Sequence, residues 1–393
     1  MDKSLKSRIY SLDLLRGLVM IIMALDHTRD FFHFDSFLHD PLDLETTTTV
    51  LFFTRWITHF CAPVFVFLAG TSIYLQAIRK SKSELSSFLF KRGLWLIFVE
   101  VVLITFAWTF TASFPVIILQ VIWAIGISMV FMSLLIHLPY SIILSLGLLI
   151  VAGHNSFDYI PSTHHGLFWD VVRNGNFATL ELFPGKQVTI IYPFLPWLGL
   201  MILGYCIGKI FTPGYNTMKR KVILVWTGSA LILFFILLRY LNIYGNPTAW
   251  LTQNTSFFTF LSFIDVHKYP PSLLFMCMTI GPALLFLAFF ENVHNKITRI
   301  ISVYGRVPFF YYVLHFYFLH LLCMILFLSR GHAFSENTPA IFGIPFRFLI
   351  SGEGYSLTIV YVIWISLVIA LYPLCKWFSD LKTRKQYWWL SYL

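Results

Sequence analysis

Long runs of apolar residues, each long enough to cross a lipid bilayer, recur along the whole chain. Windows of roughly 17–25 mostly apolar residues predict membrane-spanning helices. Ten such windows lie at residues 9–32, 51–77, 88–110, 115–136, 139–153, 190–210, 221–240, 271–291, 303–329 and 356–378. The fourth and fifth are separated only by a break around residues 138–140. The predicted fold class is therefore all-α, a polytopic bundle of about ten transmembrane helices in one domain over residues 1–393, with loops elsewhere.

Basic residues alternate between the predicted loops. One set of loops contains the clusters Lys3, Lys6 and Arg8; Arg79, Lys80, Lys82, Lys91 and Arg92; Lys219, Arg220 and Lys221; Lys296 and Arg299; and Lys382, Arg384 and Lys385. The other loops, 33–50, 154–189, 241–270 and 330–355, are longer and poorer in Lys and Arg. Because basic loops stay in the cytoplasm, both termini are expected there. An even number of spans agrees with this orientation.

Composition supports a membrane protein. The 393 residues are 58% hydrophobic and 12% charged, whereas soluble domains are about 25% charged. The net charge of +10 is spread between apolar segments, so it sets orientation and does not predict nucleic-acid binding. The five cysteines fall in apolar segments without a CxxC pair, which favours buried thiols over disulfides or a zinc site. They are Cys61, Cys206, Cys277, Cys323 and Cys375.

The first predicted span carries several ionisable residues. Such groups cost several kcal/mol at bilayer depth, so they usually face a bundle interior and serve a function. Arg16 and His27 are eleven residues apart, about three helical turns, so they share a face and stand about 16 Å apart along the axis. Asp26 and Asp30 flank His27. This span therefore presents a cation near one side of the membrane and an imidazole near the other.

Other polar residues are expected at the depth of His27. Arg55 and His59 are one helical turn apart in the second span, and Lys268 and Tyr269 precede the eighth. His315 lies in the ninth span, where Tyr311 and Tyr312 extend a polar stripe. A shared depth predicts a common polar cavity, although an isolated histidine such as His59 or His315 is also compatible with an interfacial role.

Three further features have more than one interpretation. Asp13 and Arg16 form either a functional pair or a helix-start ion pair. Glu100, in the middle of a span, must be paired or neutral, and both a structural and a catalytic role remain open. The pair His164 and His165 has no second ligand pair at useful spacing, so no metal site is expected.

Several segments, in the same order along the chain, resemble the bacterial branch of the heparan-alpha-glucosaminide N-acetyltransferase family. They are Ser11–Gly17, Asp26–Phe32, Arg55–Gly70, Tyr192–Gly199, Lys268–Ser272, Tyr304–Tyr312 and the ending 388–393. The spacing of Arg16 and His27 is also similar to a pair in the broader group of membrane acyltransferases that modify surface polysaccharides. The resemblance implies a multi-span enzyme of the bacterial cytoplasmic membrane. It would move acetyl from cytoplasmic acetyl-CoA to a sugar or glycan on the far side.

The resemblance and the residues together suggest roles. A base must take the acceptor proton, and imidazole titrates near neutral pH. We therefore expect His27 as the catalytic base or acyl carrier, with Asp26 or Asp30 orienting its ring; His33 and His39 are alternatives, because the family's lysosomal branch has its histidine further along. Predicted acceptor-side residues are Arg55, His59, Lys268, Tyr269 and His315. Predicted CoA-binding residues are Arg16, Arg92 and Arg306, because several cations would be needed for the phosphates.

Two other classes of function compete with an enzyme. A transporter or flippase would use the same buried charges as a gated ion pair, but the chain shows no clear internal repeat. A scaffold would leave Arg16, Asp26, His27 and Glu100 unexplained. The expected partners are acyl-CoA, the acceptor and membrane lipid. Nucleic acid is not an expected partner. A homodimer is left open. Amide and ester products are both open.

Overall fold

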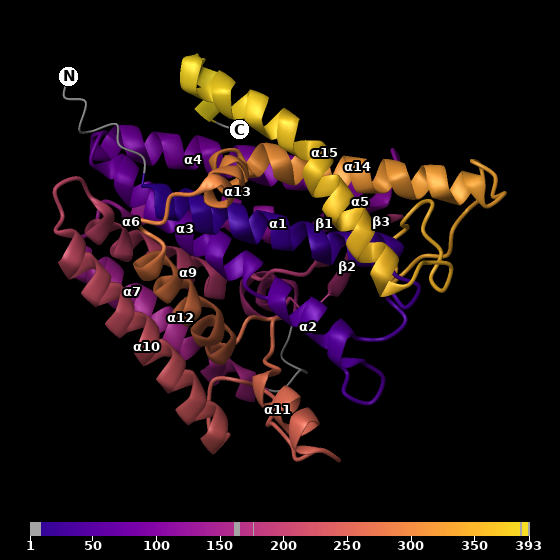
Figure 1. Ribbon diagram of the computed structural model, residues 1–393, viewed down its shortest axis with the longest axis horizontal. Coiled ribbons are helices and arrows are strands. Elements are labelled where there is room, and N and C mark those ends of the chain that lie inside the picture. The colour runs from indigo at the N-terminus through magenta and orange to yellow at the C-terminus, as the bar shows by residue number, and fades with distance from the viewer. Residues whose placement is uncertain (1–8, 161–165, 176, 386, 392–393) are drawn as a thin grey trace.

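A computed structural model describes residues 9–160, 166–175, 177–385 and 387–391 of the chain. Three basic residues used for the orientation, Lys3, Lys6 and Arg8, lie outside this part, as does the pair His164 and His165. Helices dominate the described residues, and a small sheet lies just right of the centre in Figure 1.

Fifteen α-helices follow one another in the described part of the chain. They are α1 (Tyr10–Phe32), α2 (Thr49–Thr58), α3 (Cys61–Ala77), α4 (Lys82–Val99), α5 (Thr105–Thr109), α6 (Val121–Leu135), α7 (Tyr140–Gly153), α8 (Leu167–Trp169), α9 (Phe194–Ile207), α10 (Thr217–Leu241), α11 (Ser256–Ile264), α12 (Leu273–Phe289), α13 (Lys296–Arg306), α14 (Pro308–Ser329) and α15 (Leu357–Arg384). A π-helical segment, Glu100–Ile104, joins α4 to α5. Helix α1 packs against α14 and α15 and against α3 and α12, so it runs through the middle of the bundle (Figure 1).

The predicted spans correspond to helices in the structure. Six helical segments among the described residues are long and apolar enough to cross a membrane: Thr49–Ala77, Tyr140–Tyr159, Phe194–Phe211, Thr217–Leu241, Pro308–Ser329 and Leu357–Arg384. Two shorter apolar helices are Val121–Leu135 and Leu273–Phe289. Helix α1 has 23 residues but carries five charged side chains. The chain is therefore an integral membrane protein, while the count of ten spans stays a prediction.

The expectation of an all-α fold is wrong in one region. Strands β1 (Val116–Leu119), β2 (Ala178–Phe183) and β3 (Lys186–Ile190) form a sheet in the order β1-β3-β2. Strand β1 pairs with β3 in parallel, and β2 pairs with β3 antiparallel. The fourth predicted span thus begins as a strand. Hydrophobicity alone does not distinguish a short β-branched strand from the start of an apolar helix. Here the segment pairs with β3, which lies in a predicted loop distant in the sequence. Predicted loops also contain α11 and α13.

Glycine pairs let four pairs of helices approach closely. A Cβ at Gly17 of α1 would lie 2.0 Å from the Ile301 carbonyl oxygen of α13, and one at Gly305 would lie 1.8 Å from the Asp13 carbonyl oxygen. Equivalent pairs join α3 to α9, α4 to α6 and α10 to α12; they are Gly70 with Gly204, Gly93 with Gly126, and Gly228 with Gly281. Small residues are enriched at such contacts within membranes, where close backbone packing replaces the hydrophobic effect as a source of association.

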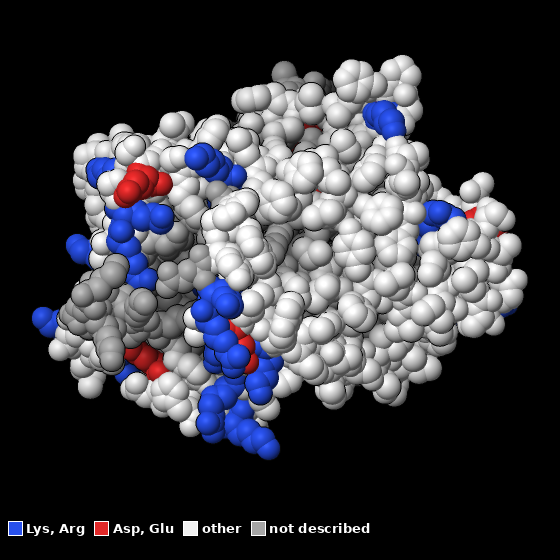
Figure 2. All heavy atoms as spheres, turned by 90° about the horizontal axis from the view of Figure 1, so that it is seen from above, with Lys and Arg blue, Asp and Glu red and all other residues white. Residues whose placement is uncertain are grey.

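Many exposed side chains on the peripheral helices are large and apolar. Exposed examples are Leu149 of α7, Trp226 and Leu233 of α10, Ile325 of α14, and Val362 and Ile369 of α15. All five cysteines are buried and unpaired. On the face seen in Figure 2, most Lys and Arg side chains gather toward the end where α1 begins, and a broad uncharged area covers the middle. A lipid-facing surface has this distribution of charge.

Backbone hydrogen bonds connect the loop after α1 with the loop before α15. The amide of Phe34 donates to the Tyr355 carbonyl at 3.1 Å, and the amide of Tyr355 donates to the Phe32 carbonyl at 2.7 Å. The segment between α14 and α15 is thereby fastened beside the segment between α1 and α2 (Figure 1). These two loops cover the end of α1 that carries His27.

Replacing Gly305 by Ala tests the closest of the glycine contacts. The added methyl group would overlap the Asp13 carbonyl, so α1 and α13 must separate. We expect the free energy of unfolding to fall by about 1–3 kcal/mol, measured by thermal unfolding in detergent. Gly153→Ala is the matched control, since a Cβ at Gly153 meets nothing within 4 Å. Equal melting temperatures for the two variants would contradict the contact.

Candidate active site

A cavity of about 470 Å³ opens where α1 ends. We call it the His27 cavity. Its walls come from α1, α2, the sheet, and the loops before α12 and α15. They include Asp26, His27, Asp30, His33, Asp35, His39, Asp40, Arg55, Trp108, Gln120, Phe177, Tyr192, Lys268, Tyr269, Phe342 and Phe346. This size falls within the range of ordinary small-molecule sites.

Asp26 is the centre of a buried ionic cluster in this cavity. Its two carboxylate oxygens accept hydrogen bonds of 2.8 and 2.6 Å from Nη1 of Arg55. Arg29 Nη2 lies 3.0 Å from Asp26 and 2.5 Å from Asp30, and Lys268 Nζ lies 4.0 Å from Asp26. Three cationic side chains thus surround two carboxylates. The cluster ties α1 to α2 and to the loop before α12.

Lys268 also contacts an aromatic wall of the cavity. Its ammonium lies 5.1 Å from the centre of the Tyr269 ring, close enough for a cation–π interaction. Burial opposes ionisation of Tyr269, but nearby Lys268 and Arg55 outweigh burial and lower the pKa of its hydroxyl. The cations therefore favour negative charge in this part of the cavity.

His27 pairs with a second histidine from α14. Nδ1 of His27 lies 2.6 Å from Nε2 of His315, and Nδ1 of His315 lies 3.1 Å from the Tyr311 carbonyl oxygen. A carbonyl only accepts, so His315 Nδ1 carries a proton, and in a neutral ring its Nε2 then accepts from His27. His27 therefore holds its own proton on Nδ1 and a lone pair on Nε2. This is the tautomer that a base or nucleophile needs.

The expectation that Asp26 or Asp30 holds the His27 ring differs from the structure. Asp26 is bound by Arg55 and Arg29, and Asp30 by Arg29. Adjacent residues of an α-helix point about 100° apart, so Asp26 faces α2 while His27 faces α14. The ring-orienting partner is His315.

A second cavity, of about 530 Å³, gathers basic residues from distant parts of the chain. We call it the basic cavity. Its cations are Arg16, Lys80, Arg92, Arg306 and Lys382. Apolar side chains cover much of the rest, among them Met20, Phe65, Leu96, Ile125 and Phe309. The three residues predicted to bind CoA, Arg16, Arg92 and Arg306, thus line one cavity. A ligand with several negative charges and an apolar arm matches it.

The two cavities approach each other at a thin layer of aromatic rings. Tyr312 lines the basic cavity and His27 lines the other, and their ring centres are 6.4 Å apart in an edge-on arrangement. The Tyr312 hydroxyl is buried without a hydrogen-bond partner among the described residues. Gln120 and Ile122 separate the cavities on another side, since Gln120 lines the His27 cavity and Ile122 the basic one. His27 therefore lies where the cavities nearly meet.

Glu100 supports this dividing wall. Its Oε2 accepts a 2.9 Å hydrogen bond from the backbone amide of Trp123, in the first turn of α6. A carboxyl oxygen at a helix start satisfies an amide that lacks a partner within the helix. This contact favours the structural interpretation of Glu100.

His59 lines neither cavity, whereas three of the other predicted acceptor-side residues line the His27 cavity. Arg55, Lys268 and Tyr269 line the His27 cavity, and His315 lies directly behind His27. Helix α2 ends at Thr58 before α3 begins at Cys61, which turns the buried His59 ring against Phe275. Continuous helical spacing therefore predicted the wrong direction for this side chain. His59, predicted on the acceptor side, therefore does not line the His27 cavity.

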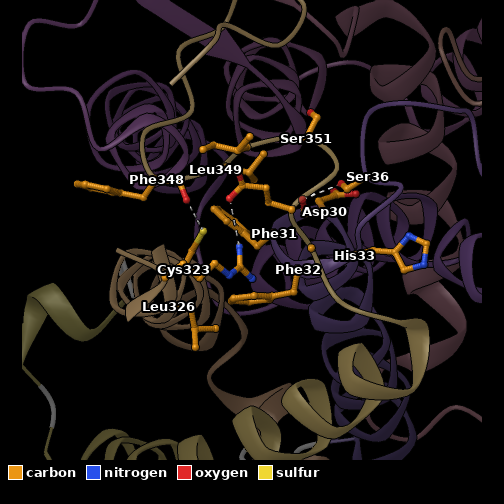
Figure 3. A pocket seen from close by; sticks show the side chains of 14 residues that line it. Asp30, Phe31, Phe32, His33, Ser36, Cys323, Leu326, Phe348, Leu349 and Ser351 are labelled. Carbon is orange, nitrogen blue, oxygen red and sulfur yellow. Dashed lines mark hydrogen bonds and ion pairs between the residues drawn. The ribbon is translucent and has the colours of Figure 1, made fainter. Parts of the chain in front are cut away.

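Two other histidines reach the rim of the His27 cavity. His39 is half exposed and lies 2.7 Å from Asp35. His33 caps the end of α1, and Figure 3 shows its side chain turned away from Cys323 and Leu326, which line a small neighbouring cavity. Burial lowers the pKa of His33, although Asp35 raises it. Neither residue lies at the layer between the two large cavities.

The site includes residues that sequence patterns did not identify. Trp108 and Phe346 line the His27 cavity and contact each other edge-on, and Lys80 and Lys382 also line the basic cavity. Lys80 and Lys382 carried a signal, since both belong to the basic loops. The aromatic residues carried none, because phenylalanine and tryptophan are frequent throughout the chain.

Comparison with known protein families gives one match. Residues 8–244 match the family described as heparan-alpha-glucosaminide N-acetyltransferase, catalytic. The match includes Arg16, His27 and Arg55 and ends before Lys268, Arg306 and His315. No curated protein matches the chain.

Replacing Asp26 by Asn tests the ionic cluster. The change leaves Arg55 and Lys268 without their carboxylate partner in a buried place. Removing one member of a buried pair costs about 3–5 kcal/mol, so we expect a clear loss of thermal stability in detergent. Glu45→Gln, at an exposed position outside the cluster, is expected to change nothing. Equal stability of the two variants would argue against the cluster as a structural anchor.

Proposed function

The chain belongs to the heparan-alpha-glucosaminide N-acetyltransferase catalytic family, and on this premise we propose that it is a membrane enzyme transferring acetyl from cytoplasmic acetyl-CoA to a sugar across the membrane. The observation that carries the proposal is the position of His27, between a basic cavity and a second polar cavity. A group transferred at His27 can leave a donor in one cavity and join an acceptor in the other.

The basic cavity is the proposed donor site. Its five cations suit the phosphates of CoA, because charge-assisted hydrogen bonds to phosphate are strong and are typically supplied by several Lys and Arg. The apolar wall suits the pantetheine arm. With the phosphates near Arg16 and Arg92, that arm extends toward Tyr312 and carries the thioester to the layer beside His27.

The His27 cavity is the proposed acceptor site. The lone pair on His27 Nε2 takes a proton from the acceptor amine or hydroxyl, whose nitrogen or oxygen attacks the thioester carbonyl carbon. The new carbon–nitrogen or carbon–oxygen bond forms as the carbon–sulfur bond breaks, and the proton passes to the departing CoA thiolate. Arg55 and Lys268 place positive charge near the developing oxyanion. His315 holds the His27 ring in the required tautomer.

An acetyl-histidine intermediate is the alternative order of events. In that order Nε2 attacks the thioester first and CoA leaves before the acceptor binds. The same lone pair serves both orders. They differ in one measurable quantity, the release of CoA in the absence of acceptor.

The proposed orientation follows the location of the basic residues. Arg16 near the start of α1 and Lys382 near the end of α15 line the same cavity, which supports placing both termini on one side. The positive-inside rule makes that side the cytoplasm. Ten spans, a single domain over the chain and the bacterial cytoplasmic membrane belong to this proposal.

A transporter is the second candidate function. Two cavities divided by a thin layer of side chains are also what alternating access requires. Transport of a solute would leave acetyl-CoA intact, whereas the proposed reaction releases one CoA for each acetyl group transferred. Counterflow of labelled solute without CoA release would favour the transporter.

Replacing His27 by Ala tests the proposed function directly. Loss of a general base lowers the rate about 10²–10⁴-fold, so we expect kcat for acetylation of glucosamine to fall in that range in purified protein. CoA release and acetylated product are measured together by mass spectrometry. His137→Ala, at an exposed position, is expected to retain full activity. Turnover of the His27 variant within a few-fold of the natural protein would overturn the proposed role.

A further inference from the structure

Phenylalanine recurs at left-handed backbone positions in this protein. Six of the seven non-glycine residues with positive φ in the described chain are phenylalanines. They are Phe37, Phe110, Phe114, Phe177, Phe342 and Phe348. This conformation costs an ordinary side chain about 1–2 kcal/mol, and asparagine or aspartate adopts it more readily. Three of the six, Phe37, Phe177 and Phe342, line the His27 cavity.

The backbone conformation at position 342 does not favour a phenylalanine. Ile341 and Ile344 exchange two backbone hydrogen bonds of 2.9 Å, and Phe342 and Gly343 between them have φ of 51° and 76°. Two central residues with positive φ make a two-residue turn of type I′, whose first position favours Asn, Asp or Gly. A phenylalanine there opposes the local preference of the turn.

Burial does not explain Phe342 either. The residue is 64% exposed, and Phe177 is 41% exposed, so neither ring gains the full free energy of core packing. Strained residues of this kind cluster at active sites and ligand-binding positions. A ring held out at the mouth of a polar cavity is available to a ligand.

The three rings form a collar with their aromatic neighbours. The centre of the Phe342 ring lies 6.3 Å from that of Phe37 and 6.1 Å from that of Phe177. The centre of the Phe177 ring lies 5.4 Å from that of Tyr269. These residues come from three loops, which follow α1, precede β2 and precede α15, and from the loop before α12. We name Phe37, Phe177 and Phe342 the aromatic collar.

We propose that the aromatic collar binds the apolar face of the acceptor sugar ring and so determines specificity for carbohydrate. This inference rests on the proposed function. Carbohydrate rings present carbon-bound hydrogens on one face, which pack on aromatic rings, and hydroxyl groups at their edge. The collar supplies the first surface. The charged residues below it, Asp30, Arg55 and Lys268, supply hydrogen-bond partners for the second.

Charge selects a sugar over an apolar occupant such as a lipid chain. A purely apolar ligand would remove water from Asp35 and Asp40 at the rim as well as from the cluster at Asp26, with no hydrogen bonds in return. Uncompensated desolvation of charged groups is costly. An occupant must therefore carry both an apolar face and several hydroxyl groups.

Replacing Phe342 by Asn removes the ring and improves the turn. Asn before Gly is the preferred pair for type I′, so the variant is expected to fold at least as stably as the natural protein. Affinity for glucosamine is expected to fall about tenfold, because one stacked ring is lost. Affinity for acetyl-CoA is expected to be unchanged, since Phe342 does not line the basic cavity.

The matched control is Phe114→Asn. Phe114 has the same left-handed backbone (φ 46°) but lines neither the His27 cavity nor the basic cavity. This variant is expected to keep the natural affinity for glucosamine. Phe342→Tyr, which keeps the ring, is expected to keep it as well. Natural affinity in Phe342→Asn, or an equal loss in Phe114→Asn, would overturn the proposal.

Equilibrium binding of glucosamine separates this proposal from the proposed function. Binding is measured by calorimetry on the His27→Ala background, where no acetyl transfer is needed for a signal. Binding that Phe342→Asn weakens supports the collar even if the natural protein transfers no acetyl. Binding that Phe342→Asn leaves intact overturns the collar while acetyl transfer stands. Cyclohexylamine, with an apolar ring and no hydroxyl groups, is expected to bind much more weakly; equal affinity would contradict recognition of a sugar.

Discussion

A charge inside an apolar bundle must be compensated, and this requirement at Asp26 organises the site. The carboxylate draws Arg55 from α2, Arg29 from its own helix and Lys268 from the loop before α12 into one cluster. Because those segments meet at Asp26, the next residue, His27, is held facing α14 and meets His315 at 2.6 Å. The position of the imidazole between two cavities thus depends on electrostatic compensation next to it.

Backbone packing brings the basic cavity to the same helix. Gly17 and Gly305 allow α1 and α13 to touch, which carries Arg306 to the basic cavity that Arg16 also lines. One central helix therefore contributes a cation to one cavity and an imidazole to the other. The layer between the two cavities contains His27 and Tyr312, whose rings meet edge-on with centres 6.4 Å apart.

Sequence patterns predicted the parts of this site that carry charge. Arg16, Asp26, His27, Arg55 and Lys268 were recognisable because ionisable residues in apolar segments are rare, and helical periodicity assigned Arg16 and His27 to one face. The patterns failed where a local break or a long-range contact decides the structure. His59 is turned by the break between α2 and α3, β1 becomes a strand only by pairing with β3, and the left-handed phenylalanines have no signature in composition.

The most direct test of the central claim is the sidedness of the reaction. The protein is reconstituted in vesicles with one orientation, acetyl-CoA is supplied on one side and glucosamine on the other, and acetylated product is measured in each compartment. Neither reactant crosses the bilayer unaided. We predict product in the glucosamine compartment only when acetyl-CoA is on the side of the basic cavity. Product that forms only when both reactants share a compartment would contradict transfer through the layer at His27.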